Sequence, residues 1–184
     1  MVMKFFRKRL NAWLITLLII ILSTSISAGS SLNELRKQAE DIFYIGEEKD
    51  GTGIQHDLDM VMSNCSNLTV VAGRYLDKEH ELISAVNEGR TALSASKTPS
   101  EKYKEAQNLL HSVTELYTYM GDLELSEKDK NFRNSLYANI NSHNIIISRN
   151  TYNQYAREFN NTLNQFPANI FGIITFITPL ELYE

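Results

Sequence analysis

The sequence predicts an all-α protein, an antiparallel bundle of about four long soluble helices preceded by one N-terminal transmembrane or signal helix. Two observations predict this fold class. Apolar residues recur at three- and four-residue steps, which is typical of amphipathic helices. No segment shows the sustained alternation of apolar and polar residues that marks a half-buried strand. The expected division is an N-terminal anchor segment at residues 1–30 and a helical domain with an apolar tail at residues 31–184.

A basic start precedes an almost wholly apolar run, and four positive charges lie in it: Lys4, Arg7, Lys8 and Arg9. Residues 10–28 are uncharged, and a stretch of this length is just enough to span a bilayer as a helix. The same features suit a cleaved signal peptide, with small residues such as Ser25 and Ser27 at the processing site. In either case the rest of the chain lies outside the cytoplasm.

Composition is ordinary for a globular chain, with 43% apolar and 22% charged residues. Without the four N-terminal basic residues, the formal net charge changes from −4 to −8. An acidic body with no basic cluster repels nucleic acid, so no nucleic-acid partner is expected. The single cysteine, Cys65, cannot form an internal disulfide, and its place in an apolar stripe favours a small buried side chain over a reactive thiol.

The first soluble helix is expected at residues 31–44, capped by Ser31 and separated from the apolar segment by a short break at residues 28–30. The polar, glycine-rich residues 46–53 then predict a loop.

Residues 54–96 form either two helices, the second restarting at Asp77 with Glu81, or one continuous helix. We favour the continuous helix, because residues 77–79 contain neither Gly nor Pro and its length would match the longest helix of the chain.

The next helix begins with a clear signal, since Thr98 can cap a helix that has Pro99 at its first position and Glu101 at its third. It runs to about Met120, and Gly121 ends it. Its apolar stripe is Tyr103, Ala106, Leu110, Val113, Tyr117 and Met120.

Residues 126–166 contain no Gly or Pro, and Ser126 with Asp129 is typical of an N-terminal cap. The simplest interpretation is one helix about 60 Å long, since each residue adds about 1.5 Å. Asn is frequent here and is a poor helix former, so burial must stabilise this helix. Its apolar stripe is Phe132, Leu136, Ile140, Ile147, Tyr152, Tyr155, Phe159, Leu163 and Phe166.

The tail is apolar and uncharged over residues 168–180, but Gly172 and Pro179 interrupt it too soon for a second spanning helix. With residues 54–96 as one helix, the tail lies close to the membrane. It then either packs on its own bundle, which we favour, or enters the membrane interface. The residues available for the interface are Ile170, Phe171, Ile174, Phe176 and Ile177.

No pattern predicts catalytic, cofactor-binding or metal-binding residues, and we expect neither an enzyme nor a bound cofactor. The acidic residues 47–59 resemble a calcium loop, but two ligand positions fail when Asp50 and Gly51 are aligned to its centre. The histidines are scattered and lack the spacing of a helical zinc site: His56, His80, His111 and His143. The alternative function is a metal-dependent sensor or enzyme that uses the 47–59 loop.

One stretch resembles a known family, residues 149–172, which read RNTYNQYAREFNNTLNQFPANIFG. It is similar to the C-terminal signature of the bacterial LemA family, where a helix with Tyr-Asn pairs ends in Phe-Pro-x-Asn and an apolar tail. Shorter upstream matches extend the likeness to about residues 31–180, and residues 47–57 depart from the family pattern.

The resemblance implies an anchored antiparallel helical bundle outside the cytoplasm, with no established catalytic residues, and it favours retention of the N-terminal segment over its cleavage. We therefore expect a single-pass cell-membrane protein with a cytoplasmic N-terminus. Its expected function is that of an extracytoplasmic scaffold or accessory protein that binds other envelope or membrane proteins.

Overall fold

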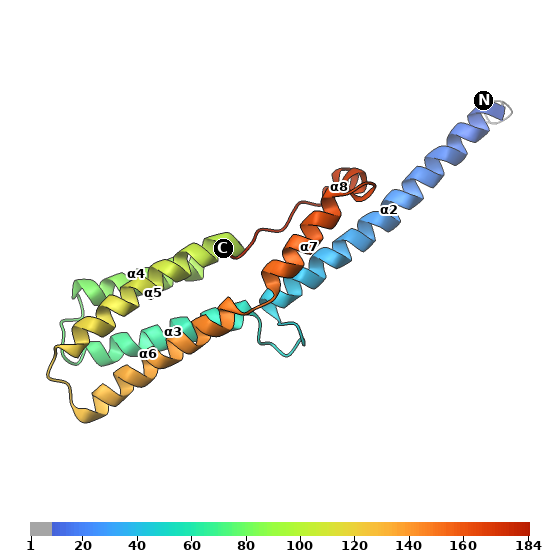
Figure 1. Ribbon diagram of the computed structural model, residues 1–184. Coiled ribbons are helices and arrows are strands. Elements are labelled where there is room, and N and C mark those ends of the chain that lie inside the picture. The colour runs from blue at the N-terminus through green and yellow to red at the C-terminus, as the bar shows by residue number, and fades with distance from the viewer. Residues whose placement is uncertain (1–8) are drawn as a thin grey trace. The chain divides into compact units, whose positions relative to one another are not determined.

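The computed structural model describes residues 9–184, and these confirm the predicted all-α fold class, with no strand among them (Figure 1). Lys4, Arg7 and Lys8 of the basic start lie outside the described residues. The helices are α2 (Arg9–Tyr44), α3 (Ile54–Ala72), α4 (Glu81–Ala95), α5 (Pro99–Gly121), α6 (Glu127–Ser148), α7 (Tyr152–Asn164) and α8 (Ala168–Thr175).

The described chain separates into two compact units. The anchor unit contains α2 up to Ala39 together with Ala156–Leu180. The bundle unit contains Glu40–Tyr155 and Glu181–Glu184.

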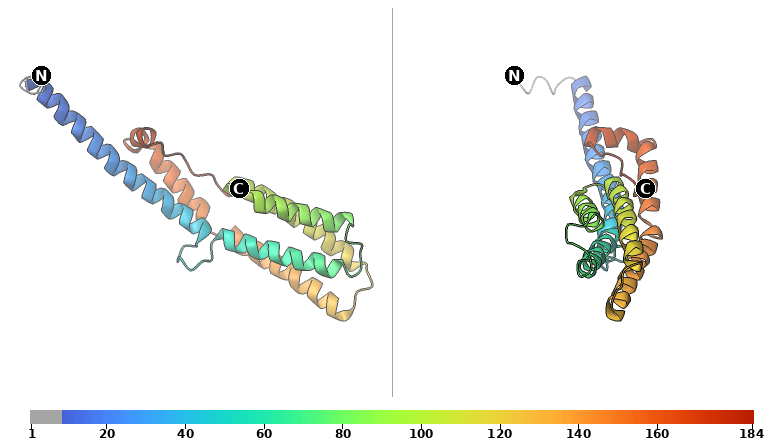
Figure 2. Two further views of the ribbon diagram at one scale, coloured as in Figure 1. Left: turned by 180° about the vertical axis from the view of Figure 1, so that it is seen from behind. Right: turned by 90° about the vertical axis from the view of Figure 1, so that its left-hand side faces the viewer.

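Four helices make up the bundle unit, and each reverses direction after the one before it (Figure 2). α3 packs chiefly on α6 and α4 on α5, while α3 also contacts α4 and α5. The core consists of side chains that these helices bury completely, among them Leu58, Leu68, Val86, Leu93, Leu109, Val113, Leu116, Met120 and Ile140. Cys65 is also fully buried, as expected, and this burial raises the pKa of its thiol to about 12.

The expected continuous helix over residues 54–96 is wrong, because a turn separates α3 from α4. Hydrogen bonds between backbone groups three residues apart form the turn without a proline, for example from Arg74 N to Val71 O and from His80 N to Asp77 O. His80 then caps α4, since its Nδ1 accepts a hydrogen bond from Leu82 N at 3.3 Å. Reversal at this turn lets α4 bury its apolar face against α5.

The expected single helix over residues 126–166 is also wrong, because the chain leaves the helix between Ser148 and Tyr152. The cause is a polar side chain: Asn150 Oδ1 accepts from Tyr152 N at 2.8 Å. Asn side chains compete with helical hydrogen bonds in this way. Two ends of the expected stripe are exposed instead of buried, Phe132 and Phe166.

The expected caps of α5 and α6 are confirmed. Thr98 and Glu101 form a reciprocal capping box, with Glu101 N donating to Thr98 Oγ1 and Thr98 N to Glu101 Oε2. Ser126 Oγ accepts from Asp129 N at 3.2 Å.

The face of α5 differs from the expected one by one position. Leu109 and Leu116 are fully buried, whereas Leu110 and Tyr117 are partly exposed. Apolar periodicity alone does not choose between adjacent apolar residues such as Leu109 and Leu110. The packing of α4 on α5 decides which of the two is buried. Gly89 of α4 lies against the backbone of Leu109, where a Cβ atom would be 3.3 Å from Leu109 Cα.

In the anchor unit, α2 continues through residues 28–30, so the break expected there is wrong. Among the described residues, Asn11–Tyr44 is the one helix long and apolar enough to cross a membrane. The views agree that α7 runs beside the second half of α2 and that α8 turns at its end (Figures 1 and 2). Arg36 Nη1 donates to Thr178 Oγ1 at 3.4 Å, which ties the segment after α8 to α2.

Candidate functional site

The bundle unit binds its own C-terminal residues, Glu181–Glu184, at the start of α7. Asn153 makes two bonds to one residue: its Nδ2 donates to Tyr183 O at 2.9 Å, and its Oδ1 accepts from Tyr183 N at 2.8 Å. Tyr152 adds a third bond, since its hydroxyl donates to Glu181 O at 2.6 Å. One amide side chain thus satisfies both backbone groups of the bound residue.

The side chain of Tyr183 fits between aromatic rings of the bundle unit. Its ring centroid lies 5.9 Å from that of Phe43 and 5.3 Å from that of Tyr103, edge to face with the latter. Phe43 in turn packs edge to face on Tyr152, with 5.0 Å between centroids. Burial, with a smaller contribution from Tyr103, raises the pKa of the Tyr183 phenol well above its ordinary value, so the hydroxyl stays neutral.

A cavity of about 160 Å³ lies beside the bound tail, among α3, α5 and α6. Half of the lining residues are Asn, Gln or Ser: Gln107, Asn144, Ser148, Asn150 and Asn153. Asn144 Nδ2 is buried, and it has no hydrogen-bond partner within residues 9–184. A buried donor left unpaired costs about 1–3 kcal/mol, so this position favours an acceptor from water or a bound group.

Neutral amides define the chemistry of this site. They donate and accept hydrogen bonds without charge, which suits polypeptide backbone or other neutral polar groups. The backbone of Tyr183, bound by Asn153, is one such group.

In the anchor unit, Asn160 makes the same pair of bonds to another tail residue. Its Nδ2 donates to Leu180 O at 2.9 Å, and its Oδ1 accepts from Leu180 N at 2.8 Å. Two asparagines of α7, seven residues apart, therefore bind backbone outside regular secondary structure in the same manner.

The acidic residues of the 47–59 loop point to different partners. Asp50 Oδ1 accepts from Thr52 Oγ1 at 2.6 Å and Thr52 N at 3.0 Å, which lowers the pKa of Asp50. Glu47 accepts from Thr151 and Tyr155, and Asp59 accepts from Gln55. In the part of the chain that the structure describes, no three His, Cys, Asp or Glu residues gather as metal ligands would.

Asp57 of the same segment pairs with a residue distant in sequence. Its Oδ1 lies 2.7 Å from Nδ1 of His143, which joins α3 to α6. The carboxylate is almost fully buried, so the histidine supplies the partner that a buried acid requires.

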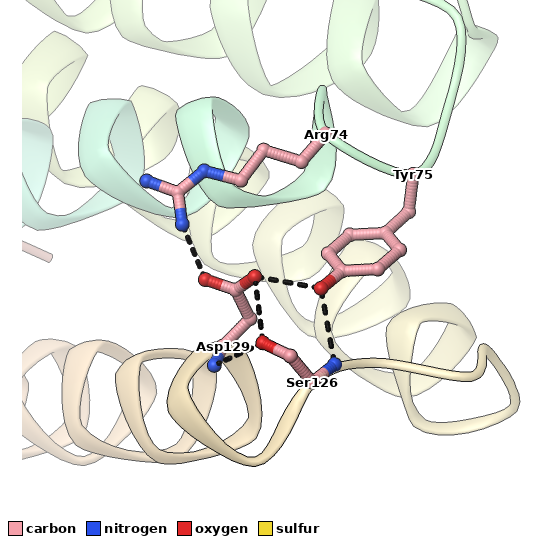
Figure 3. Close-up of polar contacts among 4 residues, drawn as sticks. All are labelled: Arg74, Tyr75, Ser126 and Asp129. Carbon is pink, nitrogen blue, oxygen red and sulfur yellow. Dashed lines mark hydrogen bonds and ion pairs between the residues drawn. The ribbon is translucent and has the colours of Figure 1, made fainter.

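A second polar cluster joins the turn after α3 to the start of α6 (Figure 3). The buried Asp129 is paired with Arg74 and accepts from the hydroxyl of Tyr75 at 2.6 Å. That hydroxyl also accepts from Ser126 N at 3.0 Å, and Ser126 Oγ donates to Asp129 at 3.0 Å. The Tyr75 hydrogen bond, followed by Ser126 and the Arg74 charge, lowers the pKa of Asp129.

The model of the LemA family matches residues 52–184. The chain belongs to the LemA family. This LemA chain is matched over its four bundle helices, the break before α7, the helices α7 and α8 and the bound tail, whereas α2 precedes the match. A comparison with curated proteins found no match.

The tail-binding residues were not predicted as a site. Tyr152 and Asn153 lie within the stretch that carries the LemA resemblance, so they contributed to the family assignment but not to a functional one. A signal was present, because Asn is unfavourable inside a helix and often marks a side chain that bonds to backbone.

Proposed function

We propose that this LemA protein is a membrane-anchored extracytoplasmic accessory protein that binds extended segments of other envelope or membrane proteins. The observation that carries the proposal is the pair of bonds from Asn153 to the backbone of Tyr183. These bonds recognise backbone N–H and C=O groups, so they do not depend on the sequence of the bound segment. The space between Phe43 and Tyr103 adds a preference for an aromatic side chain.

The tail supports this proposal as a bound segment, and a partner segment would take its place. The uncharged amides favour a neutral polar ligand, and the acidic body disfavours nucleic acid. In this proposal the protein acts by binding, without catalysis and without a resident cofactor.

The proposed location is the cell membrane. In this proposal α2 is not cleaved and crosses the membrane once, with the N-terminus in the cytoplasm and the bundle unit outside. The apolar span of α2 and the four basic residues before it support this orientation. Protease added to wall-free cells should remove a C-terminal tag while the membrane is intact. A tag that stays protected until the membrane is breached would reverse the orientation.

Binding is tested by crosslinking in the native membrane, followed by identification of partners for three variants. Asn153→Ala removes the backbone bonds and should reduce crosslinking to the partner. Deletion of residues 181–184 empties the site and should increase it. The matched control, Asn161→Ala on an exposed position of α7, should leave it unchanged.

Two outcomes would contradict the proposal. One is the absence of any protein partner above background in the parent. The other is crosslinking that does not respond to Asn153→Ala, because the partner would then bind elsewhere.

A further inference from the structure

The corner between α7 and α8 has an exposed apolar surface. We call it the tip patch; it consists of Phe166, Ile170, Ile173, Ile174 and Phe176. Exposure is high, at 80% for Phe166, 77% for Ile173 and 89% for Phe176. Within α8, only Gly172 is buried. The apolar face of this helix is therefore uncovered in the described residues.

The sequence around the tip patch lacks charge altogether. No Asp, Glu, Lys or Arg occurs between Glu158 and Glu181. An exposed apolar patch with no charged residue near it in the sequence is unfavourable in water and favourable in a lipid interface.

Packing of α8 on α7 leaves the tip patch facing outward. Gly172 lies against α7, where a Cβ atom would come within 2.6 Å of Leu163 Cδ1. This close approach uses the one side of α8 that has no side chain, and it leaves the isoleucines on the other sides exposed.

The position of α8 along α2 identifies what covers the patch. Gly29 of α2 meets Thr175 at the end of α8, where an added Cβ atom would lie 2.4 Å from Thr175 Cγ2. From Leu10 to Gly29, α2 rises by about 28 Å, and a bilayer hydrocarbon core is about 30 Å thick. If α2 spans the membrane from Leu10, Thr175 lies where the hydrocarbon ends. The first charged residue of α2 after Arg9 is Glu34, beyond this level.

We propose that the tip patch inserts into the outer leaflet of the membrane that α2 spans, as a second, interfacial attachment beside the anchor. This inference rests on the proposed spanning by α2. Insertion is driven by apolar burial, so it should occur in neutral phosphatidylcholine and should not weaken with salt.

Tryptophan quenching tests the inference in the full chain, reconstituted in phosphatidylcholine vesicles that contain lipid brominated near the headgroup. The chain has one tryptophan, Trp13, which lies in α2 and reports whether α2 is in the bilayer. In a Trp13→Phe background, Phe176→Trp and Ile173→Trp should each emit at short wavelength and lose at least half of their emission to brominated lipid. Val70→Trp, on an exposed position of the bundle unit, is the control and should not be quenched.

The outcomes separate the two proposals. Quenched Trp13 with unquenched probes at positions 173 and 176 would overturn the insertion alone. Unquenched Trp13 would overturn the span itself. Short-wavelength emission at 173 and 176 without quenching by brominated lipid would mean that protein, such as a second copy of the chain, covers the patch, and would also overturn the insertion.

Discussion

Asp129 is the residue on which the end of the bundle unit depends, because one carboxylate bonds to Arg74, Tyr75 and Ser126. These partners favour the charged form and depress its pKa in the folded protein. The stabilisation is therefore fully present above the ordinary pKa of about 4 and is lost as the pH falls through the lower, folded value.

Asp129→Asn should accordingly lower the melting temperature at pH 6, and the difference from the parent should shrink below about pH 4. The parent carboxylate becomes protonated there, and the two side chains become alike. Thermal unfolding of the full chain in detergent, followed by circular dichroism, measures this difference. A difference that stays constant down to pH 3 would show that charge on Asp129 does not stabilise the fold.

Residue-scale features were predictable where their partners are neighbours in the chain. The Thr98–Glu101 box and the Ser126–Asp129 cap each lie within a four-residue pattern. Tyr75 and Asp129 are 54 residues apart, and Asp57 and His143 are 86 apart. No local pattern identifies such pairs, because only the packing of α3 on α6 brings them together.

At the scale of elements, helix starts with a recognisable capping pattern were predictable, whereas the break before α7 was not. Thr98 and Pro99 identified the start of α5. The break before α7 depends instead on one bond from Tyr152 N to Asn150, in a sequence where Asn is common. The tail-binding site was missed for the same reason, because it uses one asparagine among many.

Asn150→Ala should therefore destabilise the start of α7 by about 1 kcal/mol, the typical value of one hydrogen bond. Asn139→Ala, on an exposed position inside α6, is the matched control and should be neutral or slightly stabilising, since Ala favours helix. Urea unfolding of both variants measures the effect. Equal stability of the two variants would mean that Asn150 does not determine the break.

The face of α5 gives a second prediction at this scale. Leu109→Asp places an unpaired charge in the core and should abolish cooperative thermal unfolding. Leu110→Asp changes a partly exposed residue beside the cavity and should leave a cooperative transition at lower temperature. If Leu110→Asp were the more damaging of the two, the originally expected stripe would be correct.

At the scale of the whole molecule, the C-terminus is held in place although it has no regular secondary structure. Its order depends on side chains of α7, and in the bundle unit these are Tyr152 and Asn153. The amide of Tyr183 should exchange slowly with solvent, because it donates to the partly buried side chain of Asn153. Asn153→Ala should accelerate this exchange at least tenfold and expose the last residues to carboxypeptidase, while the core helices keep their protection.

The control is Asn161→Ala, on the same helix, which should change neither the exchange of Tyr183 nor the cleavage by carboxypeptidase. If Tyr183 exchanged as fast in the parent as in Asn153→Ala, the tail would be free in solution, and a partner segment would have nothing to displace.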